Sequence, residues 1–322
     1  MSLAEFDLID RIRARSRARE DIVLGIGDDA ALLRAQPGHW LAVTADTLNS
    51  GVHFPPETLP ADLGWKSLAV NLSDLAAMGA APAWGTLAMS LPTAEAAWVD
   101  AFADGFFALA DTHDWRLIGG DTTRGPLSIS VTALGQVPHG KALRRDGAQA
   151  GDDIWVSGTP GEAAAALQLW QRGALDITRR AQSADIEHLR QRLLRPTPRL
   201  ALGVALRDMA TAAVDVSDGL LADLGHIAER SGVAAEVDAA AVPVADCPRR
   251  VLGDAAAREA ALCGGDDYEL CFTAGRVHRT ALLELATQLQ IPLSCIGRIR
   301  EGAGVHAGPH AGSRGYQHFS PP

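Results

Sequence analysis

The sequence has few cysteines, and their spacing excludes the common zinc and redox motifs. The four cysteines, Cys247, Cys263, Cys271 and Cys295, all lie in the last third of the chain, and none forms a C-x-x-C pair. Because the cysteine motifs for metals and redox chemistry depend on paired spacing, we expect these side chains to be small buried hydrophobic groups.

Long apolar runs are also lacking. No run of about 18 apolar residues is present, so we expect no membrane-spanning helix and no membrane partner. The first residues, "MSLAEFDLIDRIRARS", carry an acidic residue at position 5 and lack the apolar stretch of a secretion signal. A soluble protein of the cytoplasm is the resulting expectation.

Basic charge is in deficit. The chain has 29 lysines and arginines against 39 acidic residues, for a formal net charge of −10. Proteins that bind nucleic acid or anionic membranes usually carry a basic surface, so neither partner is expected. An acidic protein can still bind an anionic substrate when metal ions lie between the two.

Several signatures of nucleotide and metal sites are absent. The only Gly-Lys pair, at 140–141, is followed by alanine instead of the hydroxyl residue that a P-loop requires. The chain has no H-R-D and D-F-G set of a protein kinase, no EF-hand calcium loop and no evident Ser–His–Asp or Cys–His arrangement. Phosphate binding therefore has to come from another fold.

The order of apolar segments predicts an α/β (α+β) fold in two domains. Short strands are expected at 21–27, 40–46, 83–91 and 127–137, with helices at 61–79 and 94–113 between them. A polar, glycine-containing stretch at about 139–152 then separates an N-terminal domain, 1–138, from a C-terminal α/β domain, 150–322. The weakly similar segments "NLSDLAAMG" and "DVSDGLLADLG" each place Ser-Asp at the expected start of a helix, which is suggestive of a duplication.

Carboxylates recur in turns flanked by glycine or apolar residues, mostly where we expect strand ends or helix starts. They are Asp28, Asp29, Asp46, Asp74, Asp121, Asp215, Asp218, Asp266 and Asp267. Taken singly, each is explained as a helix cap or a turn residue. Taken together they exceed what capping needs, and divalent cations are the natural partners of clustered carboxylates. Oxygen ligands without His or Cys favour Mg²⁺ or Mn²⁺ over zinc.

Six segments contain these carboxylates and their neighbours: "GIGDDAALL", "TADTLNSGVHF", "KSLAVNLSDLAAMGAAPAW", "LIGGDTTRGPLSIS", "DVSDGLLADLGHI" and "GGDDYELCF". Together and in this order they resemble the thiamine-monophosphate kinase family, within the group that resembles aminoimidazole-ribonucleotide synthetase. The resemblance runs from about residue 5 to the terminal "GYQHF". It implies ATP-dependent, Mg²⁺-assisted phosphorylation of thiamine monophosphate to thiamine diphosphate. It also implies a homodimer in which N-terminal ATP- and Mg²⁺-binding domains share a barrel, and a C-terminal domain with a docking tail.

Roles follow from the resemblance, motif by motif. The implied magnesium ligands are Asp28, Asp29, Thr44, Asp46, Asp74, Asp121, Asp215 and Asp218, of which Asp121 and Asp218 are the implied catalytic pair. The implied nucleotide contacts are Gly120, Asp121, Arg145 and Ser217, and the implied substrate contacts are His53, Asp266 and Tyr316. From the residues alone, His53 is more simply explained as a packed structural histidine beside Phe54. Two positions depart from the family pattern: Asp266 lies where glutamate is common, and Ser313 where relatives have tryptophan.

The expected mechanism is direct in-line transfer. A phosphate is already ionised near neutral pH, so no general base is needed, but two anionic reactants require cations between them. Two alternatives stay open. One is another ATP-dependent small-molecule synthetase of the same superfamily; the other is a non-catalytic, nucleotide-binding regulatory protein.

Overall fold

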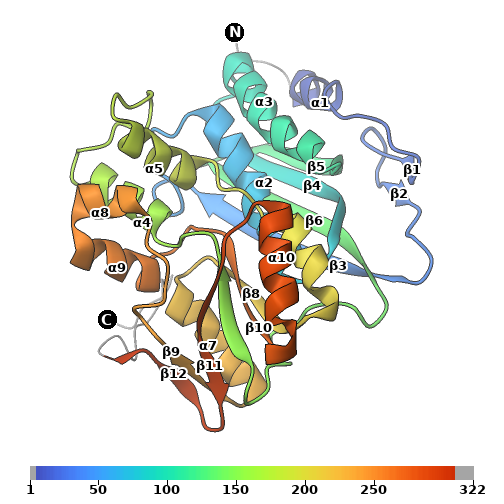
Figure 1. Ribbon diagram of the computed structural model, residues 1–322. Coiled ribbons are helices and arrows are strands. Elements are labelled where there is room, and N and C mark those ends of the chain that lie inside the picture. Colours follow the sequence, from blue (N-terminus) through green and yellow to red (C-terminus); the bar gives the residue numbers. More distant parts are fainter. Residues whose placement is uncertain (1–4, 309–322) are drawn as a thin grey trace. The chain divides into compact units, whose positions relative to one another are not determined.

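The computed structural model of the protein describes residues 5–308. Contacts between residues divide the chain into two compact units. The N-terminal unit contains the chain up to Leu75 together with Ala80–Gly140, and the C-terminal unit contains Ala76–Gly79 together with the chain from Lys141 onward. Each unit has its own main sheet (Figure 1).

The N-terminal unit is built on a four-stranded sheet of order β3-β6-β4-β5, in which only the β4–β5 pair is parallel. A short β1–β2 hairpin precedes it. The elements are α1 (Glu5–Arg13), β1 (Ile22–Leu24), β2 (Leu32–Leu33), β3 (His39–Asn49), α2 (Pro60–Ala77), β4 (Ala81–Leu91), α3 (Ala96–Thr112), β5 (Arg116–Arg124) and β6 (Ser128–Pro138).

Alternation along the strands explains why one sheet face is covered. In β6, Ile129, Val131 and Ala133 are buried, while the serines and threonines between them are half-buried. Helices α2 and α3 lie over the buried face (Figure 1). The opposite face carries exposed side chains of β3, including Leu41 and Val43.

Two glycines let α2 and α3 cross in close contact. A Cβ built on Gly105 of α3 would lie 1.8 Å from the carbonyl oxygen of Ala61, and one on Gly64 of α2 would lie 2.1 Å from that of Phe102. Both obstacles are backbone atoms and cannot turn aside. The two helix axes are therefore held at a separation that only glycine permits.

Replacing Gly105 with alanine is expected to destabilise the protein by about 1–3 kcal/mol, because the methyl group pushes the two helices apart. Gly225 offers a matched control inside another helix, where the nearest atom to an added Cβ is a Val305 methyl at 3.9 Å. Gly225→Ala should be neutral or stabilising by up to about 1 kcal/mol. Urea unfolding of both variants tests this, and equal stabilities for them would contradict the packing argument.

The C-terminal unit is built on a six-stranded sheet of order β12-β9-β11-β7-β10-β8, antiparallel except for the β12–β9 pair. Its strands are β7 (Asp153–Ser157), β8 (Ala210–Val216), β9 (Ala234–Val237), β10 (Glu269–Ala274), β11 (Leu293–Arg300) and β12 (Gly304–His306). Its helices are α4 (Glu162–Gln171), α5 (Ala184–Leu194), α6 (Leu200–Ala205), α7 (Leu220–Ser231), α8 (Asp246–Leu252), α9 (Asp254–Cys263) and α10 (Arg279–Leu289), with 3₁₀ turns at Leu206–Asp208 and Arg276–His278.

Helices of the C-terminal unit form two packed groups. The apolar side of α7 packs with the inner residues of the sheet, such as Val214, Val216 and Ile296, in one core. Helices α4, α5 and α8 contact one another and enclose a second, smaller core that includes Leu189 and Leu193. The α4–α5–α8 layer is thus held by its own apolar packing.

The structure corrects several sequence-based expectations. Asp46 and Asp121 lie inside β3 and β5 rather than in turns, and Asp74 lies in the last turn of α2 rather than at a helix start. Asp218, by contrast, does precede α7, so the proposed echo between the two Ser-Asp segments does not correspond to equivalent positions. Cys295 is exposed, whereas Cys247 is buried as expected.

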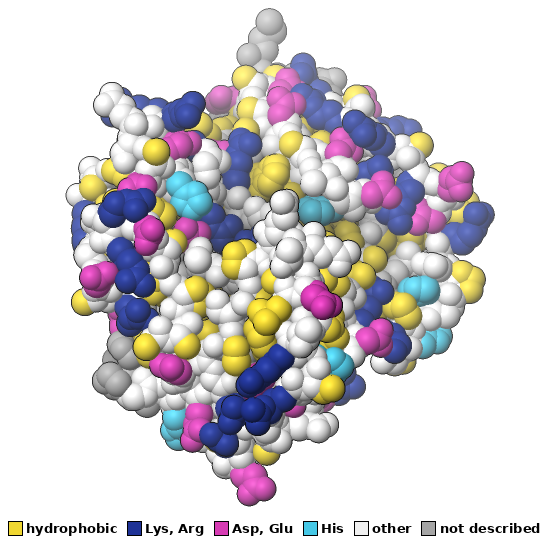
Figure 2. Space-filling view, in the orientation of Figure 1, with side chains coloured by type: hydrophobic (Ala, Val, Ile, Leu, Met, Phe, Trp, Pro, Cys, Tyr) yellow, Lys and Arg dark blue, Asp and Glu magenta, His cyan; other side chains and the backbone are white. Residues whose placement is uncertain are grey.

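The surface carries charged side chains of both signs, and none of the described helices is both long and strongly apolar. Acidic and basic side chains are interspersed across the face drawn in Figure 2. Among residues 5–308, no helix is long and apolar enough to cross a membrane.

Candidate active site

Three of the predicted metal ligands meet between β3 and α2 in the N-terminal unit. The Thr44 hydroxyl donates a hydrogen bond to Asp74 Oδ2, and the backbone N–H of Asp46 donates to Asn71 Oδ1 at 3.0 Å. Asn71 is fully buried and its amide donates to the Ser67 carbonyl at 3.0 Å, which fixes its orientation. Asn71 was not predicted, and it ties the helix that carries Asp74 to the strand that carries Asp46.

Strand register separates Asp121 from this cluster. Asp46 and Gly120 lie in one row across the sheet, with Val131 and Leu87 between them. They are three strand spacings, or about 14 Å, apart. Asp121 is exposed and falls in the next row, so its side chain belongs to the other face of the sheet.

The packing of β5 against β4 by itself explains why residue 120 is glycine. A Cβ at this position would lie 1.8 Å from the Leu87 carbonyl oxygen of the neighbouring strand. The close approach of β4 to β5 thus requires glycine, whatever else binds there. The sequence "GGDTTRG" was expected to be a turn, but all of it except the last glycine belongs to β5.

Asp28 and Asp29 lie in the exposed loop between β1 and β2. The N–H of Asp29 donates to Asp28 Oδ1 at 2.8 Å, so the first carboxylate orders the loop around the second. Gly27 has φ +122°, and the Arg13 guanidinium lies against it, with Nη1 2.8 Å from where a Cβ would be. The loop therefore has a cation beside it that the sequence "LGIGDDAALL" does not contain.

His53 closes the turn that follows β3. Its Nδ1 accepts a hydrogen bond from the Asn49 N–H at 3.0 Å, and Gly51 N–H donates to the Phe54 carbonyl at 2.9 Å. Accepting at Nδ1 places the proton of the neutral ring on Nε2. This histidine therefore has a structural role, as the residues alone indicated. A contact with substrate, which the resemblance predicts, would have to be made by Nε2.

In the C-terminal unit, the loop between β8 and α7 is held by a buried carboxylate that sequence reasoning missed. The N–H groups of Ser217, Asp218 and Gly219 donate to Asp223 Oδ2 at 3.0, 3.0 and 3.1 Å. Burial raises the pKa of Asp223 to about 7, against the lowering effect of these N–H groups. An acidic residue in the first turn of a helix that reaches back to its N-terminal N–H groups is the signal that could have identified it.

A second loop lies directly against the first. The Asp266 N–H donates to the Ser217 carbonyl, and the Tyr268 N–H donates to the Val216 carbonyl, both at 2.8 Å. A Cβ on Gly265 would lie 2.3 Å from the Ser217 oxygen. Asp266 and Tyr268 have φ of +70° and +54°, and the Tyr268 hydroxyl donates to Asp266 Oδ1 at 3.0 Å. Left-handed backbone at two non-glycine residues is typical of functional loops.

These contacts bring several predicted residues together at one end of the sheet. Asp215, 3% exposed, occupies the penultimate position of β8, beside Leu270 of β10. Asp218 follows it in the loop, and Asp266 lies beside that loop. The structure thus places two implied metal ligands and one implied substrate contact side by side in this unit.

Of two further predicted residues, Arg145 lies apart from this group and Tyr316 lies outside the described residues. Arg145 is exposed, and its carbonyl accepts a hydrogen bond from the Ser231 hydroxyl at 2.9 Å. Its neighbour Arg144 accepts one from the Ala213 N–H at 3.0 Å, so the segment follows the edge of β8. Tyr316, like Ser313, lies outside the described residues.

Asp267, next to Asp266, points the other way, into the unit. It accepts hydrogen bonds from the N–H groups of Gly161, at 2.5 Å, and Ala163, at 3.3 Å, at the start of α4. Full burial raises its pKa to about 8, opposed by these N–H groups. The "GGDDYEL" segment therefore supplies one half-buried carboxylate and one that anchors α4.

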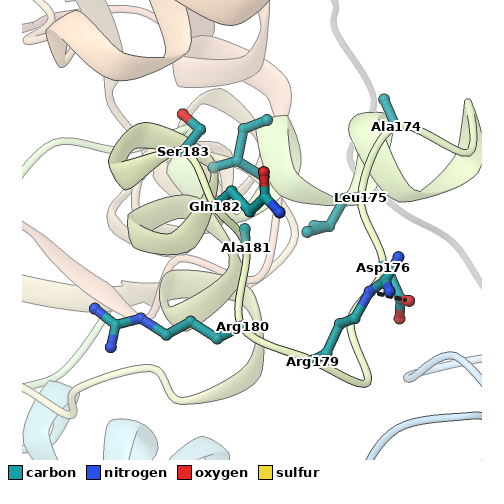
Figure 3. A pocket seen from close by; sticks show the side chains of 9 residues that line it. Ala174, Leu175, Asp176, Arg179, Arg180, Ala181, Gln182 and Ser183 are labelled. Carbon is teal, nitrogen blue, oxygen red and sulfur yellow. Dashed lines mark ion pairs between the residues drawn. The ribbon is translucent and has the colours of Figure 1, made fainter.

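A pocket of about 430 Å³ lies elsewhere in the C-terminal unit. Its lining comes from the segment between α4 and α5 and the start of α5: Ala174, Leu175, Asp176, Arg179, Arg180, Ala181, Gln182, Ser183 and Ile186. Figure 3 shows Arg179 turned toward Asp176, with which it forms a 2.8 Å ion pair, and Arg180 pointing away. Because it contains no predicted site residue, we do not assign the pocket to the active site.

Two sequence models of known families match the chain. The N-terminal domain of AIR synthase related protein matches residues 27–137, and the C-terminal domain of the same family matches residues 149–308. Thiamine-monophosphate kinase of Salmonella typhimurium is 48% identical over the full length of both chains.

Solved structures that resemble this chain include members of the same kinase family. The crystal structure of thiamine-monophosphate kinase from Stenotrophomonas maltophilia K279a is 66% identical, with a TM-score of 0.90 over 98% of this chain and 99% of that one. AaThiL complexed with AMPPCP and TMP is 33% identical, with a TM-score of 0.79 over 99% of each chain. These likenesses extend over both units, and the chain belongs to the thiamine-monophosphate kinase family.

Proposed function

We propose that this protein transfers the γ-phosphoryl group of ATP to thiamine monophosphate, giving thiamine diphosphate and ADP. The observation that carries the proposal is the full-length similarity to AaThiL, a relative solved with AMPPCP and TMP. AMPPCP is an ATP analogue, so that relative binds a nucleotide and an acceptor together. The similarity covers 99% of this chain and 99% of that relative.

The donor chemistry of the carboxylate clusters fits Mg²⁺. Thr44, Asp46 and Asp74 offer hydroxyl and carboxylate oxygens at one place, and Asp215 and Asp218 offer two more carboxylates at the end of β8. Oxygen donors without histidine or cysteine are what Mg²⁺ prefers. We assign these five residues as Mg²⁺ ligands, and Asp28, Asp29 and Asp121 as further ligands from exposed positions.

The remaining assignments concern the two reactants. Gly120, Asp121, Arg145 and Ser217 are assigned to the nucleotide. His53, Asp266 and Tyr316 are assigned to thiamine monophosphate, with His53 donating from Nε2 because Nδ1 is occupied by the Asn49 N–H. Asp266 is one methylene shorter than glutamate, and its left-handed backbone at φ +70° and its bond from Tyr268 set where its carboxylate points.

The reaction needs orientation and charge neutralisation rather than proton abstraction. An ionised phosphate oxygen of thiamine monophosphate attacks the γ-phosphorus of ATP, and ADP leaves in line with it. Bound Mg²⁺ supplies neutralisation of the charge that develops on the transferred group. The protein holds the carboxylates in place through Asn71 in one unit and Asp223 in the other. The similarity to the kinase family supports assigning the catalytic roles to Asp121 and Asp218.

Incubation of the purified protein with ATP, Mg²⁺ and thiamine monophosphate tests the function. Equal amounts of thiamine diphosphate and ADP are expected, as separated by anion-exchange chromatography. Thiamine without its phosphate is the control acceptor and should give no product. Phosphorylation of a different acceptor would favour the synthetase alternative, and nucleotide binding without turnover would favour the regulatory one.

We further propose that the N-terminal domain, 1–138, mediates a homodimer through β3 and that the C-terminal domain, 150–322, is a separate α/β unit. In the described part of the chain, β3 is an edge strand of eleven residues that pairs only with β6. Trp40, Leu41 and Val43 on it are 52%, 48% and 61% exposed. A long, apolar edge strand is normally covered, and a shared barrel between two copies would cover it.

Val43→Asp is expected to convert the dimer to a monomer, since a carboxylate buried in an apolar interface costs several kcal/mol. Val277 provides the matched control, because it is 85% exposed and lies in the C-terminal unit. Val277→Asp should leave the mass unchanged. Light scattering after size-exclusion chromatography measures both, and a dimeric Val43→Asp variant would exclude this face as the interface.

A further inference from the structure

Three side chains of different chemical types converge in the α4–α5–α8 layer of the C-terminal unit. Glu162 Oε1 lies 2.8 Å from His188 Nε2 and 3.6 Å from Cys247 Sγ. All three ligand atoms lie within 4.8 Å of one another. Among the side chains that the structure describes, residues 8–308, no other group of three His, Cys, Asp or Glu meets this condition. None of the three belongs to the proposed kinase site.

The three positions come from separate helices that are already packed together. Glu162 is the first residue of α4, His188 lies in the middle of α5, and Cys247 lies in the first turn of α8. Each of these helices contacts the other two, around a shared apolar core. The ligand geometry is therefore set by rigid elements, which is the condition for a well-formed metal site.

We propose that Glu162, His188 and Cys247 bind one divalent transition metal ion of the Zn²⁺ type. A carboxylate, an imidazole and a thiolate together suit Zn²⁺ and are a poor set for Mg²⁺. Three protein ligands leave a fourth tetrahedral position for water. The His188 side chain is 52% exposed, whereas that of Glu162 is 6% exposed, so the ion enters from the histidine side.

The two distances from Glu162 require only small movements, and the ligand atoms of His188 and Cys247 lie within 4.8 Å of each other. Zinc bonds of about 2.0–2.3 Å in a tetrahedron place the ligand atoms about 3.3–3.6 Å apart. The Glu162–Cys247 distance of 3.6 Å already matches, and the Glu162–His188 distance of 2.8 Å has to open slightly. In the metal-bound form, bonds to the ion replace the hydrogen bonds that now link these groups.

Charge is balanced at the site. Glu162 and a deprotonated Cys247 together offset the two charges of the ion. Arg192 lies 3.1 Å from Glu162 Oε2, on the other carboxylate oxygen, and also pairs with Glu269 at 2.9 Å. The arginine thus orients Glu162 with Oε1 toward His188 and Cys247. Burial, and then Glu162, raise the pKa of the Cys247 thiol to about 12. Binding therefore breaks the S–H bond, forms the S–metal bond and releases the proton to solvent.

A metal ion bound at this site would link helices α4, α5 and α8. It would also stiffen the start of α4, where Gly161 and Ala163 hold Asp267 beside the Asp266 loop. An ion that binds only the folded state raises the unfolding temperature, and the rise grows with the logarithm of the ion concentration once that exceeds the dissociation constant. This effect is independent of Mg²⁺ and of turnover, so it can be measured without the kinase reaction.

Co²⁺ titration of the purified, chelator-treated full chain tests the proposal. We expect one thiolate-bound ion per chain, marked by a thiolate-to-cobalt charge-transfer band and tetrahedral d–d bands, and the displacement of that ion by Zn²⁺. Cys247→Ser and His188→Ala should bind at least about tenfold more weakly. Cys295→Ser and His226→Ala are matched controls, because each replaces an exposed cysteine or histidine elsewhere in the same unit. Both variants should bind Co²⁺ as tightly as the wild type.

Several outcomes would overturn the site. These are absence of the charge-transfer band at several-fold excess of Co²⁺, its persistence in Cys247→Ser, or its loss in Cys295→Ser. Thermal unfolding provides a second measurement that does not depend on the serine variant folding well. Zn²⁺ should raise the midpoint of the wild-type protein but not that of His188→Ala, whose changed side chain lies at the surface. Equal midpoint shifts in both proteins would contradict the proposal.

Discussion

Asp218→Asn is expected to reduce turnover by about 10²–10³-fold while leaving the unfolding free energy within about 1 kcal/mol of the wild type. The substitution keeps the shape of the side chain and removes one charge from a proposed Mg²⁺ ligand. The backbone of the loop stays in place, because the N–H groups of Ser217, Asp218 and Gly219 bind the Asp223 carboxylate. Steady-state kinetics should also show a higher Mg²⁺ concentration at half-maximal rate.

Asp254→Asn is the matched control for this prediction. Asp254 opens α9 in the same unit, its side chain is 84% exposed, and it pairs with Arg249 at 3.4 Å. A surface ion pair of this kind contributes little to stability, and no catalytic role is assigned to it. Turnover of Asp254→Asn should equal that of the wild type. Undiminished turnover in Asp218→Asn would remove Asp218 from the proposed machinery.

Asp223→Ala is expected to reduce both activity and stability. Three backbone N–H groups lose their acceptor, and we expect a loss of about 2–4 kcal/mol in unfolding free energy. The loop that presents Asp218 then moves, which should lower turnover by about 10–100-fold, as when an orienting partner of a metal ligand is removed. Urea unfolding and steady-state kinetics measure the two effects.

Asp223→Asn separates the role of the acceptor from the role of the charge. Burial raises the pKa of Asp223 to about 7, so near neutral pH this carboxyl group is already partly uncharged. Asparagine keeps an acceptor oxygen and should retain most of the stability and turnover that alanine loses. Asp176→Ala is the control, because Asp176 accepts the Thr178 N–H at 3.0 Å in an exposed loop without site residues. Equal effects of Ala and Asn at position 223 would contradict the positioning role.

Regular periodicity in the sequence identified the main N-terminal elements. Helices were expected at 61–79 and 94–113, and the structure has α2 at Pro60–Ala77 and α3 at Ala96–Thr112. The apolar alternation likewise predicted β3, β4 and β6. Strand β5 was missed as a strand because two adjacent glycines lower strand propensity. Only the neighbouring carbonyl of Leu87 shows why glycine is required at position 120.

The residue types of the candidate site were also predictable from the sequence. The residues that hold them in position, Asn71 and Asp223, were not. Carboxylates in this order carried the resemblance to the kinase family, and the comparisons confirm that family. The positions of Asp46, Asp74 and Asp121 within their elements were wrong, because a cap and an interior residue look alike in an isolated motif. Asn71 and Asp223 were missed, since each acts on backbone groups that tertiary contacts bring within reach.

The sequence by itself determined the family, through the order of its motifs, and the mixed α/β character of the fold. It also predicted a division into two domains and the oxygen-rich chemistry of the proposed site. These follow from composition, periodicity and motif order, all of which are local in the chain. Tertiary structure alone decided which side chains touch. Cys247 was expected only to be small and buried, which it is, yet its neighbours Glu162 and His188 are 85 and 59 positions away in the sequence. Such neighbours are chosen by the packing of α4, α5 and α8, and no local pattern records that packing.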